Sequence, residues 1–135
     1  MTALLVAVAM AAATRADVNQ VLAAADAMES AHAFDAARRQ LDSIVGALPA
    51  EEADSVRLRI CGLWARQGEV AAARQCYGAT AFAGDEARAR ARYHAAALGV
   101  DAGDALAALA LAALIYDLPH TLGARRALLL ARGLA

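Results

Sequence analysis

The sequence predicts an all-α protein: a right-handed α-solenoid of three antiparallel helix hairpins followed by a C-terminal capping helix. The first observation is composition, because the apolar fraction is 61% while the aromatic fraction is only 4%, and alanine supplies most of the apolar residues. Alanine is the best helix former and a poor strand former. The second observation is a segment written three times, at residues 32–38, 68–74 and 103–109, with spacings of 36 and 35 residues. Repeats of this period are typical of stacked helical hairpins.

The first hairpin is expected from residues 17–31 and 34–48, where apolar side chains recur at helical spacing. Asp17 and Gln20 have the spacing of a capping box, which indicates a helix start. Pro49 is expected to stop the second helix, because proline disfavours helical geometry in the residue before it.

The second hairpin begins with the carboxylates Glu51, Glu52 and Asp54, which favour a helix start through the helix dipole. The third helix is expected to run from there to Gly68. The fourth helix is expected to continue as far as Gly84.

The third hairpin opens at Asp85, and its first helix is expected to end near Gly99. Residues 103–116 are almost entirely apolar. A helix that is hydrophobic all round is buried on several sides, so another segment has to cover it. Residues 120–132, after the break at Pro119, are expected to form that capping helix.

The amino terminus carries an unbroken apolar run from Ala3 to Ala13. Eleven residues are too few to cross a bilayer as a helix, so no integral membrane span is expected. The run matches the apolar part of a signal peptide, with small residues suited to cleavage after Ala13 or Ala16. We therefore expect a signal peptide at 1–16, a single domain at 17–135 and a periplasmic or secreted protein. In the alternative, the run is an extra helix over the first hairpin and the protein is cytoplasmic.

The two cysteines lie symmetrically about the middle bend, because Cys61 and Cys76 are equally far from the midpoint of Gly68 and Glu69. Residues equidistant from the bend of an antiparallel helix pair lie at the same height. If both point inward, they are close enough for a disulfide. The other interpretation is that both are small buried hydrophobic residues, as free cysteines often are.

The middle copy resembles the tetratricopeptide repeat, a helix-turn-helix unit. Its small Cys61, aromatic Trp64, Gly68 turn, Ala73 and Tyr77 fall at that family's characteristic positions. The equivalent places in the first copy are held by Ala25, Met28, Phe34, Ala37, Leu41 and Pro49. The chain departs from the pattern in two ways. His32 replaces a turn glycine, and each copy is one or two residues longer than the family's repeat. A Sel1-like repeat is the second resemblance, although its glycine-rich turn is missing.

The resemblance implies that the first helix of each hairpin lines a concave groove that binds a partner peptide or helix. The groove residues carried over by repeat position are Asn19, Leu22, Asp26, Glu29, Ser55, Leu58, Arg59, Arg66, Arg90, Tyr93 and His94. Arg59, Arg66 and Arg90 are suited to holding a carboxylate or an acidic segment by charge-assisted hydrogen bonds. The alternative is that each arginine pairs with an acid of its own chain, as Glu86 is spaced to pair with Arg90.

No pattern in the sequence indicates catalysis or a cofactor. His32, His94 and His120 are far apart in sequence, without a cysteine or carboxylate at metal-ligand spacing. Cys61 lacks an identifiable histidine base, and a net charge of −1 does not favour nucleic acid. The sequence therefore predicts a non-catalytic protein–protein interaction scaffold. With the expected signal peptide, this scaffold is expected in the cell envelope. The alternatives are an accessory helical domain of a cell-wall enzyme and a homo-oligomeric structural protein that associates through its C-terminal leucines.

Overall fold

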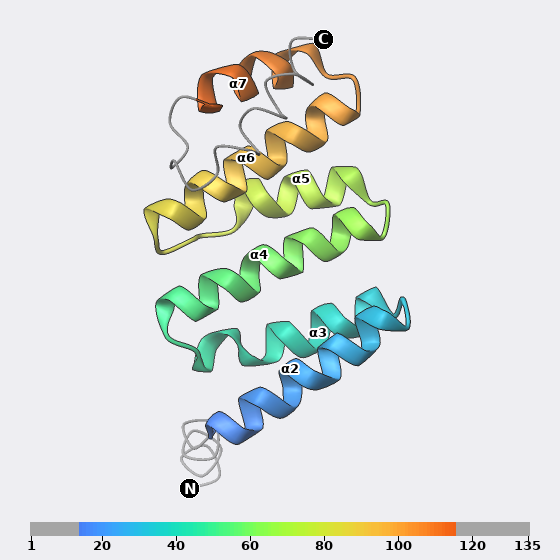
Figure 1. Ribbon diagram of the computed structural model, residues 1–135, viewed down its shortest axis with the longest axis vertical. Coiled ribbons are helices and arrows are strands. Elements are labelled where there is room, and N and C mark those ends of the chain that lie inside the picture. Colours follow the sequence, from blue (N-terminus) through green and yellow to red (C-terminus); the bar gives the residue numbers. More distant parts are fainter. Residues whose placement is uncertain (1–13, 116–135) are drawn as a thin grey trace, which may run out of the picture.

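The computed structural model describes residues 14–115, which are all-helical and contain no strand. The prediction of an all-α protein is therefore confirmed for this part of the chain. The elements are α2 (Arg15–Ser30), α3 (Phe34–Ile44), the short 3-10 helix η1 (Val45–Ala47), α4 (Ala50–Arg66), α5 (Val70–Ala79), α6 (Asp85–Asp101) and α7 (Ala105–Ile115). Each helix packs against the next one along the chain, and α4 also contacts α6 (Figure 1).

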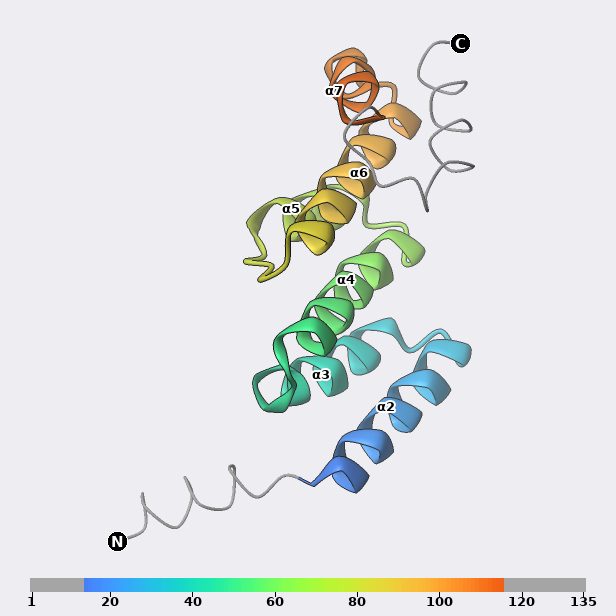
Figure 2. The same ribbon diagram turned by 60° about the vertical axis from the view of Figure 1, so that its left-hand side comes forward.

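The helices form a stack in which the chain turns back at every step. In Figure 1 the bends between α2 and α3, between α4 and α5, and between α6 and α7 all lie along the right-hand edge. The longer links from α3 to α4 and from α5 to α6 lie along the opposite edge. Turning the molecule keeps this order, with α4 in the middle of the stack and α6 next to α7 at its upper end (Figure 2). The first helices of the three pairs, α2, α4 and α6, can therefore share one face of the stack.

The three bends have the same backbone conformation. Each contains one residue with positive φ, which is 59° at His32, 88° at Gly68 and 82° at Gly103. The amide of the following residue donates to a carbonyl five residues back, as from Ala33 to Met28 at 2.8 Å and from Glu69 to Trp64 at 3.0 Å. This is the Schellman ending, which satisfies carbonyls at a helix C-terminus. Positions in the three helix pairs can therefore be compared by counting from the bend.

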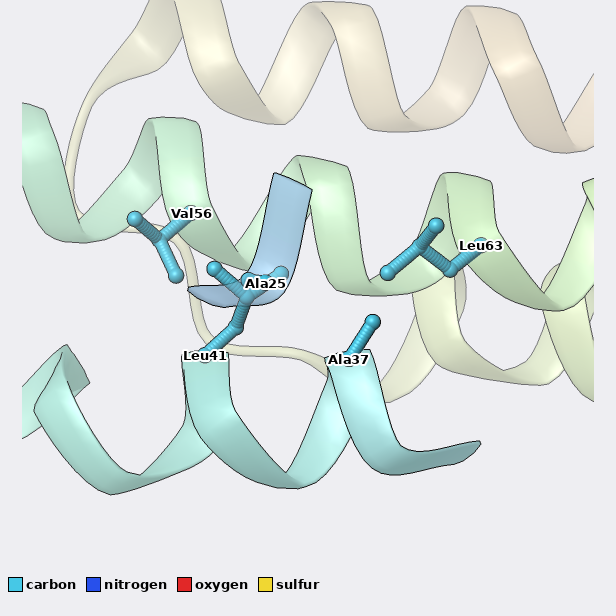
Figure 3. Close-up of a cluster of buried hydrophobic side chains, with 5 residues drawn as sticks. All are labelled: Ala25, Ala37, Leu41, Val56 and Leu63. Carbon is cyan, nitrogen blue, oxygen red and sulfur yellow. The ribbon is translucent and has the colours of Figure 1, made fainter. Parts of the chain in front are cut away.

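Small residues let the helices approach closely in the core. Figure 3 shows Leu41 of α3 between Ala25 of α2 and Val56 of α4, with Ala37 and Leu63 completing the cluster. Ala25, Ala37 and Leu41 are fully buried.

The same small positions recur in the other pairs. Seven residues before the bend stand the buried Ala25, Cys61 and Ala96, and five residues after it stand Ala37 and the fully buried Ala73. A larger side chain at these positions would push the packed helices apart.

Gly99 marks a close approach between α6 and α7. A Cβ added to this residue would lie 2.5 Å from the Cβ of Ala107 and 3.0 Å from a guanidinium nitrogen of Arg74. Counted from the bends, Trp64 holds the position of Gly99 in the middle pair. The glycine therefore allows α7 to pack more tightly on α6 than an aromatic residue would.

Three predicted helix boundaries are wrong. The first helix starts at Arg15, because Thr14 rather than Asp17 is its cap: the Thr14 hydroxyl accepts from the Asp17 amide at 3.2 Å, and the Thr14 amide donates to the Asp17 carboxylate at 3.0 Å. The helix expected to reach Gly84 ends at Ala79.

The second of these errors has a tertiary cause. Residues 80–84 leave the helix to carry the chain across to α6, and they place Phe82 in the core. The second helix also ends earlier than expected, at Ile44, because η1 precedes Pro49. The expected signal segment up to Ala13 and the expected capping helix at 120–132 lie outside the described residues.

Candidate functional site

The face made by α2, α4 and α6 contains two neighbouring hollows. The hollow between α2 and α4 has a volume of about 390 Å³ and is lined by Asp26, Glu29, Ser30, Arg59 and Arg66. Four of these five residues belong to the predicted groove. The structure therefore brings together side chains that are about 30 residues apart in the sequence.

An ion-pair network fills the hollow between α2 and α4. Arg59 donates to Glu29 at 2.8 Å and also pairs with Asp26, and Arg66 pairs with the same Glu29 carboxylate. The Glu29 side chain is only 20% exposed, so its charge needs these partners. Both arginines thus serve first to join α4 to α2, which is the alternative that the sequence left open.

The hollow between α4 and α6 is larger, at about 610 Å³. It is lined by Ala50, Glu51, Asp54, Ser55, Leu58, Ala83, Gly84, Asp85, Glu86, Ala87 and Arg90. Ser55, Leu58 and Arg90 belong to the predicted groove. Four carboxylates and one arginine make this lining acidic, and the arginine is already paired with Glu86 at 3.0 Å.

Asp54 is the buried anchor of this second hollow. Its carboxylate accepts hydrogen bonds from the amides of Ala83 at 2.9 Å and Gly84 at 2.8 Å, and Arg57 lies 3.5 Å away. Burial raises the pKa of Asp54, but the two amide hydrogen bonds and the Arg57 charge outweigh it and leave the pKa below its usual value. Gly84 is the N-cap of α6 and has no side chain, and Asp54 of α4 holds the two residues that lead into α6 through their backbone amides.

The remaining predicted groove residues lie outside both hollows. Asn19 is exposed on α2, and Leu22 packs against the core cluster shown in Figure 3. Tyr93 is 8% exposed and belongs to a core cluster with Leu111 of α7. His94 stacks on Tyr77 with ring centroids 5.3 Å apart and meets the edge of Tyr93. These four residues therefore do not form one surface with the other seven.

Cys61 and Cys76 are joined by a disulfide in the structure, with Cα atoms 5.4 Å apart. The bond links α4 to α5, the two helices of the middle pair. Cys61 is fully buried at a position held by alanine in the other two pairs. The disulfide thus occupies a helix-packing position, away from the lining of both hollows.

Two arginines that the sequence reading passed over hold neighbouring pairs together. Arg38 is buried with its guanidinium 3.4 Å over the Trp64 ring, and it donates to Gln67 in the next bend at 2.7 Å. Arg74 stands at the same distance from its own bend and donates to Asp104 in the next bend at 3.0 Å. Their identical spacing within the copied segment was the available signal.

Neither a metal centre nor a membrane-spanning helix is found in residues 14–115. No three His, Cys, Asp or Glu side chains of this region could hold a metal ion together. None of its helices combines the length and apolar character needed to cross a bilayer.

Comparison with known proteins gives no relative to argue from. No protein-family model, no curated protein and no solved structure matches the chain. The assignment of function therefore has to rest on the surfaces described above.

Proposed function

We propose that this protein is a non-catalytic scaffold of the tetratricopeptide-repeat type, in which three helix hairpins and a C-terminal capping helix form a short right-handed solenoid. The three bends with one hydrogen-bond pattern support this assignment. The recurring buried small residues at Ala25, Cys61 and Ala96 support it further. The Sel1-like repeat, with its extended glycine-rich turn, agrees less well with bends of only three residues.

The scaffold binds an extended peptide or a helix of another protein along the face of α2, α4 and α6. One observation carries this proposal: seven side chains named from repeat position alone line two adjacent hollows on this face. A segment lying across both hollows would meet Arg59 and Glu29 in the first and Ser55 and Leu58 in the second. Concave, partly apolar hollows with a few placed polar groups are the usual form of a binding site.

The charge on this face sets the contacts available to the partner. A partner carboxylate could replace Asp26 on Arg59, because the Asp26 side chain is 67% exposed and an exposed ion pair contributes only about 0–1 kcal/mol. Glu29 is 20% exposed and keeps its arginines. Such an exchange costs little. The binding face can therefore accept an acidic group without unfolding any element.

The test blocks the second hollow without touching the core. Ser55 is exposed, and its hydroxyl donates to the Glu51 carbonyl of its own helix at 3.3 Å. Ser55→Trp fills the hollow and should abolish capture of partners from the native organism, measured by affinity capture and quantitative mass spectrometry. Ser43→Trp is the matched control, because Ser43 is equally exposed on α3 and bonds its own helix at 2.6 Å. Capture of the same proteins by wild type and Ser55→Trp would rule the groove out.

We propose in addition that residues up to Ala13 are an export signal and that the mature protein works in the cell envelope. Cleavage after Ala13 would keep Thr14, whose capping box starts α2, and Arg15, which pairs with Glu52 at 2.5 Å. Cleavage after Ala16 would remove both. A disulfide between Cys61 and Cys76 suits an oxidising compartment. Mass spectrometry of the protein from its host tests this, and a mature chain beginning at Met1 would contradict it.

A further inference from the structure

A third groove, larger than both hollows, lies on the other side of α6. It runs between α5 and α7 with α6 as its floor and has a volume of about 790 Å³. Arg92 of α6 points into it, whereas Arg90 lines the acidic hollow on the opposite side. Side chains two positions apart in a helix, such as Arg90 and Arg92, point about 200° apart around the helix axis. The two arginines therefore lie on opposite sides of α6, which separates two independent surfaces.

The lining of this groove is mainly apolar. Its carbon surface comes from Ala95, Ala96, Leu106, Ala107, Ala110 and Leu114. Leu106 is 76% exposed, so its side chain contributes little to the packing of α7 on α6. Exposed large apolar residues gathered at a groove are typical of surfaces that bind another molecule.

Comparison with the preceding helix pair shows that the stack does not require these side chains. Counted from the bend, Leu106 and Leu114 of α7 correspond to Ala71 and Ala79 of α5. The preceding pair is therefore assembled with alanine where the last pair carries leucine. Leu106 and Leu114 are therefore features of the last pair that the middle pair does not share.

The same comparison identifies an arginine without an ion pair. Arg57 of α4 pairs with Asp54 at 3.5 Å, three residues earlier in its helix. At the corresponding positions of α6, Arg92 is kept but Ala89 replaces the aspartate. Among residues 14–115 no carboxylate pairs with Arg92, while Arg74 on the same rim is held by Asp104. The groove thus presents one available cation beside an apolar surface.

We infer that the groove between α5 and α7 is a second docking surface, which takes an apolar segment of another protein carrying a carboxylate that reaches Arg92. The leucines provide the apolar contact, and the guanidinium is suited to holding a carboxylate through two parallel hydrogen bonds. The charge of Arg92 decides between occupants. Residues 116–135 contain three arginines and a single acid, Asp117, only two residues past α7, so they complement this rim poorly. This surface is independent of the face of α2, α4 and α6.

The test selects peptides from a random displayed library on the full-length protein and measures the affinity of enriched peptides by fluorescence anisotropy. Leu106→Ala and Arg92→Ala should each weaken binding of one class of peptides at least about tenfold. Two matched controls should bind that class like the wild type. Leu109→Ala changes a leucine that is 70% exposed on α7 but does not line the groove, and Arg39→Ala removes an exposed arginine of α3 that also lacks an ion pair to residues 14–115.

A charge test on the peptide completes the design. Replacing the glutamate or aspartate of an enriched peptide by its amide should weaken binding to the wild type but not to Arg92→Ala, because the two changes remove the same contact. Ser55→Trp should leave these peptides bound, so failure of the first binding face would not affect this result.

Four results would overturn the inference. The first two are that no enriched peptide depends on Leu106, or that binding ignores Arg92. The third is nuclear Overhauser contacts in the free protein between Leu106 and residues 116–135, which would make the chain its own occupant. The fourth is a dimer in sedimentation equilibrium that Leu106→Ala dissociates, which would make a second copy the occupant.

Discussion

Replacing Asp54 by alanine should destabilise the protein more than changing any exposed acid. The carboxylate is 7% exposed and accepts two amide hydrogen bonds, at 2.9 and 2.8 Å, from the loop before α6. A hydrogen bond to a charged group contributes about 1.5–3 kcal/mol, but the amides lie at the edge of a hollow where water can reach them, so we expect about 1 kcal/mol each. With a further contribution of about 0–1 kcal/mol from the ion pair to Arg57, Asp54→Ala should lower the free energy of unfolding by about 2–3 kcal/mol.

Urea denaturation followed by circular dichroism measures this change. For a domain of this size the loss corresponds to a decrease in Tm of about 8–12 °C. Asp42→Ala is the control, because Asp42 is exposed on α3 without an ion pair to residues 14–115, and it should change stability by less than about 0.5 kcal/mol. If the two variants unfold at the same urea concentration, the hydrogen bonds of Asp54 to the loop before α6 do not stabilise the protein.

The pH dependence of stability gives a second measurement of the same contact. Because the folded pKa of Asp54 lies below its unfolded value, its contribution is fully present above the unfolded pKa, near pH 4, and is lost as the pH falls through the folded pKa. The contribution of Asp54 to the Tm should thus stay constant from pH 7 to about 5 and should decrease below about pH 4. Asp54→Asn should show a shallower acid decrease than the wild type. An unchanged acid slope would contradict the assignment.

Three further predictions concern the backbone and the disulfide. Gly99→Ala should lower the free energy of unfolding by about 1–3 kcal/mol, because its Cβ would lie 2.5 Å from a Cβ of α7. Gly78→Ala in α5 is the control, because its Cβ would meet nothing within 4 Å, and it should raise stability in the same thermal melt. His32→Gly should raise stability by about 1 kcal/mol, because His32 has φ of 59°, and a decrease would show that its ring contact outweighs the backbone strain. Reduction of the Cys61–Cys76 bond, which closes a loop of 15 residues, should cost about 3 kcal/mol, and the double alanine variant should not respond to reductant.

The sequence was sufficient to predict features that depend on local spacing. The three bends follow from single residues at fixed intervals. The symmetry of Cys61 and Cys76 about the midpoint of Gly68 and Glu69 indicated a disulfide as one of two interpretations, the other being two buried free cysteines. These predictions required no knowledge of distances between pairs. The exception was the start of α2, where Thr14 was assigned to the signal segment and its capping box with Asp17 was overlooked.

The predictions that failed or stayed open depend on contacts between helix pairs. The reach of Arg59 to Asp26 spans 33 residues, and nothing in local spacing distinguishes this pairing from an arginine available to a partner. Tyr93 was placed in the groove by repeat position, but in the third pair the all-apolar α7 draws it into the core with Leu111. Repeat position therefore predicts which helix carries a residue more reliably than which side of that helix it occupies.

Comparing the helix pairs with one another separates structural from functional positions when no relative is known. Where all three pairs agree, as with Ala37, Ala73 and Ala108, the residue serves the packing that every pair needs. Where the third pair departs from the middle pair, which folds with Asp54 and Ala71 at the positions of Ala89 and Leu106, packing gives no reason for the difference. A departure that exposes an apolar side chain or releases a charge costs stability or solubility unless something covers it. Leu106 and Arg92, the arginine that Ala89 leaves without a carboxylate partner in residues 14–115, both line the groove between α5 and α7, so this groove is where binding should first be sought.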